Sequence, residues 1–268
     1  MRLHQRDYTK LNGKEKSEWL NIQQRERRDR DSLPRLKVAW SIHDYSKAIR
    51  HFWHLFPNNY LDTAELKKTR MLERKVERFR SLLASPRLTE RRILRLIREE
   101  RAHFIVGSIL KNFDFGHHEA YLFPEFPLGT SHKPDYLLVG KSSGGYEFVF
   151  VELEAPAKNI TIRGGDFGKA FRNGRSQVAD WDRWLNAHYQ TLSEIFCRFK
   201  RSDMNLPAEF THFDQSRVHF VVVAGRRGDF KEKTYRMRRS GRQKGGPLVL
   251  HYDNLLDSAE GIIGKRTY

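Results

Sequence analysis

The run 146–153, YEFVFVEL, places the strongest constraint on what this chain can fold into. In a β-strand successive side chains point to opposite faces, so Phe148 and Phe150 share one face while Val149 and Val151 share the other. A strand that is apolar on both faces is typical of the centre of a sheet covered by helices on both sides. We therefore expect residues 146–153 to form a central, buried strand.

Two carboxylates, Glu152 and Glu154, end this strand before Pro156 stops the pattern. Because residues two apart share a face of a strand, both acids continue the line of the two phenylalanines. In α/β sheets, ligands commonly bind beyond the carboxyl ends of the strands. The two glutamates are therefore candidate functional residues.

A third acid comes from the preceding predicted strand, PDYLLVG at 134–140. If Lys141 pairs with Tyr146 across the loop 142–145, the antiparallel register places Asp135 opposite Glu152. Directly opposed side chains have Cβ atoms about 4.5–5.5 Å apart. A slip of one residue would move Asp135 to the other face, so this expectation depends on the loop length.

The pair Asp135 and Glu152 predicts a divalent metal site. Two like charges held this close repel each other unless a cation lies between them. Oxygen ligands without His or Cys favour Mg²⁺ or Mn²⁺, and the backbone carbonyl of Leu153 is a further candidate ligand. The alternative is that the acids pair with local bases, which include Lys133, Lys158 and Arg163.

The remaining pattern predicts an α/β fold with a mixed sheet. Apolar, β-branched and aromatic runs bounded by Gly and Pro predict further strands at 120–129, 217–225 and 247–253. A long amphipathic helix is expected at 166–196, between two strands. Earlier in the chain, helical spacing predicts a helix at 63–85 and, after the N-cap candidate Thr89, another to about residue 113.

The first part of the chain has a different composition and predicts a mainly helical, charged region. Pro86 interrupts the helical pattern, so we place a boundary there, with residues 1–88 as the N-terminal region and residues 89–268 as the sheet-containing domain. The arginine-rich stretch 25–30 also contains acids, which favours a helix face over an arm that binds DNA.

Charge points to a polyanionic partner. Lys and Arg number 50 against 33 Asp and Glu, which gives a net charge of +17 and a pI near 10.0. Such a balance favours nucleic acid or an acidic membrane surface. The segment 226–244 is the most basic, and a solvated loop or an oligomer contact is its alternative. The predicted DNA-binding residues are Arg226, Arg227, Arg236, Arg238, Arg239 and Arg242, with Arg163 beside Gly164 and Gly165.

Several functional classes find no support in the sequence. Cys197 is the single cysteine, which excludes an internal disulfide framework and a thiolate zinc site. There is no Walker A loop or GxGxxG motif, and no histidine lies in zinc-site spacing with a cysteine. The N-terminus lacks the apolar core of a signal peptide, and no apolar run approaches about 18 residues. We therefore expect a cytoplasmic protein without membrane association.

These residues resemble a known nuclease signature. Pro134-Asp135 and the later Glu152-Leu153-Glu154 resemble the PD-(D/E)XK pattern, and the helical QVADW at 177–181 is similar to the Gln-x-x-x-Tyr motif of RecB-like members. With HFVVVAGRR and LVLHYDNLL added, the set resembles the Shedu family of bacterial anti-phage defence proteins, over roughly residues 90–258.

The resemblance implies a restriction-endonuclease-like PD-(D/E)XK core and a Mg²⁺-dependent DNA endonuclease that acts on double-stranded phage DNA, often as a homo-oligomer. Asp135 and Glu152 match the metal-binding acids, and Gln177 matches the glutamine that positions the substrate or the attacking water. Glu125 is implied as an outer acid, and Glu100 as a weaker candidate.

Glu154 departs from this pattern because it stands where the signature usually has lysine. A glutamate cannot stabilise the negative charge of the transition state, but it can bind metal or accept a proton from water. Lys169 on the next helix, or Lys158, is the candidate replacement. The departure supports one alternative, a catalytically impaired module that binds or senses nucleic acid. A nuclease of DNA repair or mobile elements is a further alternative.

Overall fold

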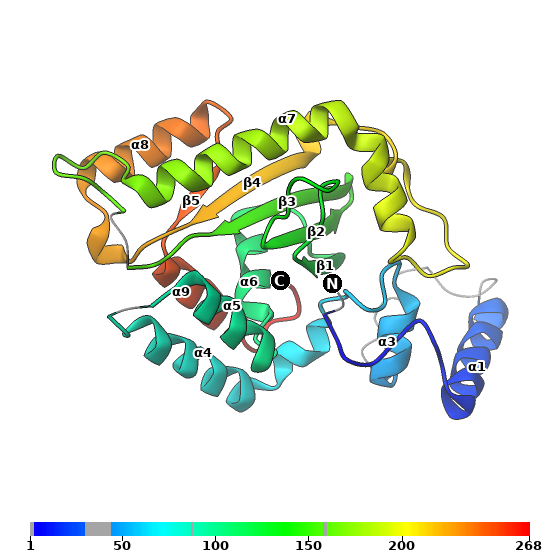
Figure 1. Cartoon of the computed structure of the whole chain (residues 1–268). Coiled ribbons are helices and arrows are strands. Elements are labelled where there is room, and N and C mark those ends of the chain that lie inside the picture. The colour runs from blue at the N-terminus through cyan, green and yellow to red at the C-terminus, as the bar shows by residue number, and fades with distance from the viewer. Residues whose placement is uncertain (1–2, 30–43, 87, 158–159) are drawn as a thin grey trace.

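The fold is centred on a five-stranded mixed sheet with strand order β1-β2-β3-β4-β5 (Figure 1). The computed structural model describes residues 3–29, 44–86, 88–157 and 160–268, to which all structural statements below refer. The strands are β1 (Glu119–Pro124), β2 (Tyr136–Ser142), β3 (Gly145–Leu153), β4 (Val218–Val223) and β5 (Leu248–Leu250). The first three strands are antiparallel, while β4 and β5 run parallel to β3. The predicted α/β class with a mixed sheet is confirmed.

The predicted register of the central hairpin is also confirmed. Lys141 pairs with Tyr146, and the register continues to the pair Tyr136 and Val151 at the far end. The turn is tighter than expected because Ser142 pairs with Gly145. Glycine suits this last position, where φ is 104°.

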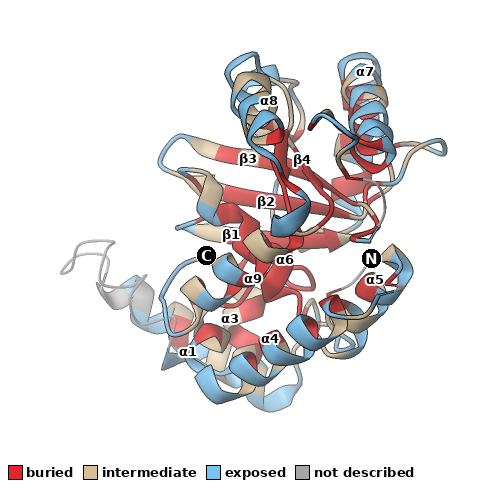
Figure 2. Ribbon diagram, turned by 90° about the vertical axis from the view of Figure 1, so that its left-hand side faces the viewer, coloured by how far each residue is buried: buried red, intermediate tan, exposed pale blue. Residues whose placement is uncertain are grey.

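Helices cover both faces of the sheet (Figures 1 and 2). One face carries α7 and α8, and the other carries α4, α5, α6 and α9. The bounds are α4 (Thr69–Leu83), α5 (Glu90–Glu99), α6 (Phe104–Gly107), α7 (Lys169–Cys197), α8 (Glu232–Gln243) and α9 (Tyr252–Ile262). None of the described helices combines the length and the apolar composition needed to span a lipid bilayer.

Strand β3 is buried on both faces, as its sequence predicts. Phe148 and Phe150 belong to the hydrophobic cluster beneath α7, which also contains Trp181. Val149 and Val151 belong to the opposite cluster, with α4, α5 and α9. The exposed fraction of these four strand residues is between 0% and 1%, so their burial fixes the direction in which β3 leaves the core.

The N-terminal region is mainly helical where it is described. It contains α1 (Gly13–Asp29), α3 (Lys47–Trp53) and the 3₁₀ turn η2 (Thr63–Lys67), followed by α4. The arginine-rich stretch therefore lies on a helix up to Asp29. Residues on both sides of position 88 contribute to each hydrophobic cluster, such as Phe56 in one and Phe79 in the other. The boundary at 88 itself stays a prediction.

The predicted helix from Thr89 to about residue 113 is wrong beyond its first part. Thr89 is the N-cap of α5, but α5 ends at Glu99, and Arg101 has a φ of 50°. The segment 104–110 is buried throughout and forms α6 and the 3₁₀ turn η3 (Ser108–Asn112). A straight helix would leave part of this apolar segment in water, so the chain turns at Arg101 and enters the core.

Candidate metal centre

The hairpin brings Asp135 next to the end of β3. Asp135 directly precedes β2, and its Oδ2 accepts a hydrogen bond of 2.8 Å from the backbone N–H of Leu153. Glu152, the neighbouring residue on β3, is buried with 7% of its surface exposed. The predicted pair of carboxylates therefore lies together at the carboxyl end of the central strand.

Burial and mutual repulsion perturb both acids. Burial raises the pKa of Glu152 well above the usual range, and the charges of Asp135 and Glu154 raise it further, against a hydrogen bond from Gln177 that lowers it. Burial likewise raises the pKa of Asp135, which the bond from the Leu153 N–H partly offsets. Two such carboxyls resist ionising together without a cation.

A further acid, Glu90, lies near this pair, although it is not among the site residues that the sequence predicts. It is the first residue of α5, and its charge helps to raise the pKa of both Asp135 and Glu152. An acid in the first turn of a helix usually signals favourable interaction with the helix dipole, so its sequence position gave no reason to single it out. Only the packing of α5 against the sheet brings it to the strand ends.

Glu154 lies where α7 and α9 meet β3. Its backbone N–H donates to the Val223 carbonyl at 2.8 Å, and its own carbonyl accepts from the Tyr252 hydroxyl at 2.7 Å. A Cβ added to Gly174 of α7 would come within 3.3 Å of the Glu154 Cγ and 2.7 Å of Val222. Glycine at 174 therefore lets α7 approach the end of β3 closely.

Replacing Gly174 with alanine is expected to destabilise the protein by about 1–3 kcal/mol, because the overpacked contact with Val222 forces α7 away from the sheet. Gly241→Ala in α8 is the matched control, since its added Cβ meets nothing within 4 Å and alanine should add about 0.5–1 kcal/mol of helix stability. Urea unfolding of both variants measures the difference. Equal stabilisation by both substitutions would contradict the close approach of α7.

Gln177 lies on α7, and its side chain is near enough to Glu152 to lower the pKa of that carboxyl, so the structure brings this predicted residue to the pair. Lys169 does not share this position. It is the exposed first residue of α7, about 12 Å from Gln177 along the helix axis. Lys158, the other candidate lysine, lies outside the described residues.

The two outer acids differ in position. Glu125 lies beside Asp135, whose carbonyl accepts a 2.7 Å bond from the Glu125 N–H. Its carboxylate, however, is exposed and pairs with Lys133 at 2.8 Å. Glu100 lies beyond the far end of α5 and pairs with Arg78. Glu125 is therefore adjacent to the pair, and Glu100 is remote from it.

The donor set fits a divalent cation. Neither Asp135 nor Glu152 forms an ion pair with any lysine or arginine in the part of the chain that the structure describes. Within that part, no three His, Cys, Asp or Glu side chains are arranged to hold an ion by themselves. Mg²⁺ is commonly held by one or two carboxylates and otherwise keeps its waters, which suits a two-carboxylate site. The contribution of the Leu153 carbonyl stays a prediction.

Comparison with protein families identifies the region that contains this site. Residues 87–256 match the family described as Shedu protein SduA, C-terminal, which covers more than half of the chain. The chain belongs to the Shedu family. The search of curated proteins found no match.

The Shedu region contains a clamp in the segment that the sequence predicted to bind DNA. Arg226 contacts both carboxylate oxygens of Asp253, at 2.8 and 3.1 Å, and donates to the Leu83 carbonyl at 2.6 Å. Burial alone would raise the pKa of Asp253, but hydrogen bonds from Arg226 and from the Arg227 N–H outweigh it and lower the pKa. Arg226 therefore joins β4, α4 and α9.

Breaking this clamp with Asp253→Asn is expected to cost about 1.5–3 kcal/mol, because a bidentate, charge-assisted contact is lost and Arg226 stays half-buried. Asp257→Asn is the matched control on the same helix. Its pair with Arg227 is more than half exposed on both sides, so its loss should cost at most about 1 kcal/mol. Thermal unfolding distinguishes the two, and equal effects would contradict the clamp.

The other predicted DNA contacts occupy different environments. Arg227 pairs with Asp257 and Arg236 with Glu232, while Arg242 donates to the Asn112 carbonyl. Arg238 is half-buried, and burial together with the nearby Arg242 and Arg239 lowers its pKa despite the opposing effect of Tyr235. Arg163 is exposed beside Gly164. A role of these residues in DNA binding stays a prediction.

Proposed function

We propose that this Shedu-family chain is a Mg²⁺-dependent DNA endonuclease that acts in bacterial anti-phage defence. The observation that carries the proposal is the pair of carboxylates at the end of the central strand, half-buried Asp135 and buried Glu152, with Gln177 near Glu152. Buried acids with raised pKa values beside one another are typical of a site that receives a cation. Double-stranded phage DNA, a homo-oligomeric assembly and a cytoplasmic location stay predictions.

The chemistry would divide between the ion and the chain. When bound, Mg²⁺ supplies electrostatic stabilisation of the charge on the phosphodiester and lowers the pKa of water. Asp135 and Glu152 would hold the ion, and Gln177 would fix the orientation of the Glu152 carboxylate. Glu154 would accept the proton of the attacking water in place of the family's lysine.

Glu154→Gln tests the role of Glu154 separately from metal binding. Loss of a general base typically lowers the rate by about 10²–10⁴-fold, whereas stabilisation by Mg²⁺ should remain if Asp135 and Glu152 hold the ion. Single-turnover cleavage and Mg²⁺-dependent melting measure the two properties. Unchanged cleavage would contradict the role as a base.

A plasmid assay tests the proposed activity. The protein is incubated with supercoiled and linear DNA in Mg²⁺ or EDTA, beside Asp135→Ala and Glu152→Ala. Glu147→Ala is the control, because Glu147 lies on the same strand but pairs with His219 at 2.7 Å. We expect Mg²⁺-dependent cleavage by the native chain and the control alone. Cleavage that survives in both site variants contradicts the site.

The second candidate function is a module that binds or senses nucleic acid without cleaving it. The observation that favours it is Glu154 in the lysine position, with Lys169 exposed at the start of α7. DNA binding without cleavage under Mg²⁺ and Mn²⁺ would support this candidate. Phage plating on cells that carry the native chain or Glu152→Ala distinguishes defence from a role in repair.

A further inference from the structure

A cavity of about 790 Å³ lies along α5 and reaches the candidate metal centre. Asp135 lines it at one side, together with Glu125 and Tyr136 at the strand ends. The wall on the α5 side is formed by Leu94 and by four arginines: Arg91, Arg95, Arg98 and Arg101. The same space therefore contains a row of cations and one of the two site carboxylates.

The spacing of these arginines follows from the helix. Arg91, Arg95 and Arg98 are four and three residues apart, which places them on one face of α5. The apolar residues Ile93 and Ile97 lie elsewhere on the helix and are 0% exposed in the core. Anchoring of these isoleucines therefore holds the arginine face towards the cavity.

The three helical arginines have no internal partner for their charge among the described residues. Arg91, Arg95 and Arg98 are exposed, and none forms an ion pair with a residue that the structure describes. By contrast, Arg78 and Arg80 on the neighbouring helix α4 pair with carboxylates. The positive charge along α5 is therefore available to an anion from outside the chain.

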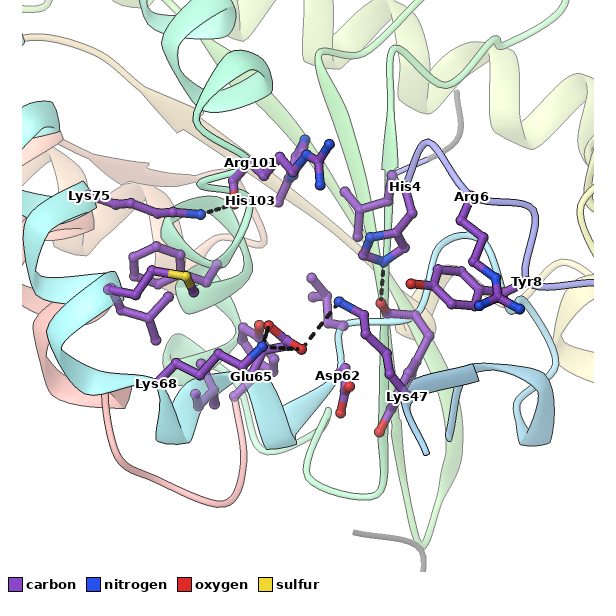
Figure 3. Close-up of a pocket in the computed structure, with 18 of the residues that line it drawn as sticks. His4, Arg6, Tyr8, Lys47, Asp62, Glu65, Lys68, Lys75, Arg101 and His103 are labelled. Atoms are coloured by element: carbon purple, nitrogen blue, oxygen red, sulfur yellow. Dashed lines mark hydrogen bonds and ion pairs between the residues drawn. The ribbon is translucent and has the colours of Figure 1, made fainter. Parts of the chain in front are cut away.

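The neighbouring cavity, shown in Figure 3, provides a comparison. It has a volume of about 530 Å³ and also contains lysines, but Lys47 and Lys68 both pair with Glu65 there. Neither Asp135 nor Glu152 lines it. Arg101, with its φ of 50°, lines both cavities, and its carbonyl accepts a bond from Lys75. The α5 cavity therefore differs from its neighbour because arginines without ion pairs to described residues lie there together with Asp135 of the candidate metal centre.

We infer that the arginine face of α5, defined as Arg91, Arg95 and Arg98, binds the phosphodiester backbone of DNA and directs one strand to Asp135. Successive arginines are about 6 and 4.5 Å apart along the helix axis, so the row is about 10.5 Å long. Phosphates of one strand follow each other about every 3.4 Å along a duplex axis, so the row is long enough to contact several of them. Arginine also suits bidentate contact with phosphate oxygens. The inference rests on the proposed function, since the strand bound by the arginine face is directed to Asp135 of the candidate metal centre.

The test measures DNA binding without cleavage. Fluorescence anisotropy of a labelled duplex is recorded in EDTA and in Ca²⁺ at several salt concentrations, with the full chain. The triple variant Arg91→Gln, Arg95→Gln and Arg98→Gln is compared with Arg92→Gln. Arg92 is exposed on the same helix and forms no ion pair with a described residue, but it does not line the cavity.

We expect the triple variant to lose at least tenfold in affinity. Each lost phosphate contact reduces the slope of log K against log salt by about 0.9, so the slope should fall by about 2.7. Arg92→Gln should change neither quantity. Equal affinity of the native chain and the triple variant, or no binding of duplex by the native chain, overturns the inference.

Two outcomes distinguish this inference from the proposed function. If the native chain binds DNA through the arginine face but cleaves nothing under any divalent cation, the inference stands and the nuclease proposal fails. If cleavage depends on Glu152 but the triple variant binds and cleaves normally, the nuclease proposal stands and DNA binding by the arginine face of α5 is rejected. A change in oligomeric state of the triple variant without loss of DNA binding would instead assign this face to a second copy of the chain.

Discussion

Glu152→Gln is expected to lower Mg²⁺-dependent DNA cleavage by about three orders of magnitude, because the amide removes one of the two carboxylates proposed to hold the cation. Asp135→Asn should have a similar effect. Since the two acids are proposed to form one site, the double variant should lose little more than either single variant. Single-turnover rates on linear duplex at saturating protein measure these effects.

The control is Glu147→Gln on the same strand, which alters the surface contact with His219 and should leave the rate within about twofold. Circular dichroism establishes that each variant is folded. Multiplicative losses in the double variant would contradict a single shared site, because independent groups contribute additively to the activation free energy. Full activity of Glu152→Gln would place the cation elsewhere.

The second large effect concerns stability and pH. Burial and neighbouring charges raise the folded-state pKa of Asp135 and of Glu152 above the unfolded values of about 3.9 and 4.3. A raised pKa means that the folded state binds more protons than the unfolded state above about pH 4. The contribution of these groups to stability therefore falls as pH rises towards their folded pKa values. Each unit by which the folded pKa exceeds the unfolded pKa lowers the free energy of unfolding by about 1.4 kcal/mol once the group is ionised.

Buried histidines oppose this trend, so the difference between variants is the useful quantity. Burial lowers the pKa of His51 and of His103 to about 3, which makes their contribution to stability rise as pH increases through about 6.5. Subtracting the free energy of unfolding of the native chain from that of Glu152→Gln removes the histidine contribution, which is common to both. In metal-free buffer we expect the variant to become increasingly more stable than the native chain from pH 5 to pH 8.

Mg²⁺ should reduce this difference in stability at high pH. A ligand at about 100 times its Kd stabilises the folded state by about 2.7 kcal/mol, so the native chain should gain stability with Mg²⁺, more at pH 8 than at pH 6. Glu152→Gln should gain little. Chemical denaturation at each pH, with Mg²⁺ or EDTA, measures both effects. A stability difference that does not change with pH would contradict buried, mutually repelling carboxylates.

The central hairpin was predictable because local rules determine it. Alternation on both faces identified β3, and the register from Lys141 and Tyr146 fixed the position of Asp135 relative to Glu152. The hydrophobic core leaves little freedom here, since a shift of one residue would turn Phe148 and Phe150 away from α7. The pair of acids was therefore within reach of sequence alone.

Features that depend on packing between distant elements were not predictable. Glu90 lies near the acids only because Ile93 and Ile97 of α5 pack in the same hydrophobic cluster as β3. The sequence predicts that the arginine-rich segment 226–244 binds DNA, yet Arg226 in this segment is paired with Asp253. Charge in a sequence does not show which cations already have an internal partner. The arginines of α5 could be recognised only when their lack of ion pairs and their cavity were seen.

A crystal of the protein grown or soaked with Mn²⁺, with an anomalous difference map recorded at the manganese edge, tests the central claim most directly. The account predicts one anomalous peak between Asp135 and Glu152, with carboxylate oxygens about 2.0–2.3 Å from the ion. Crystals of Glu152→Gln under the same conditions should lack this peak. A peak at another group of residues, or none at these two carboxylates at saturating Mn²⁺, would contradict the account.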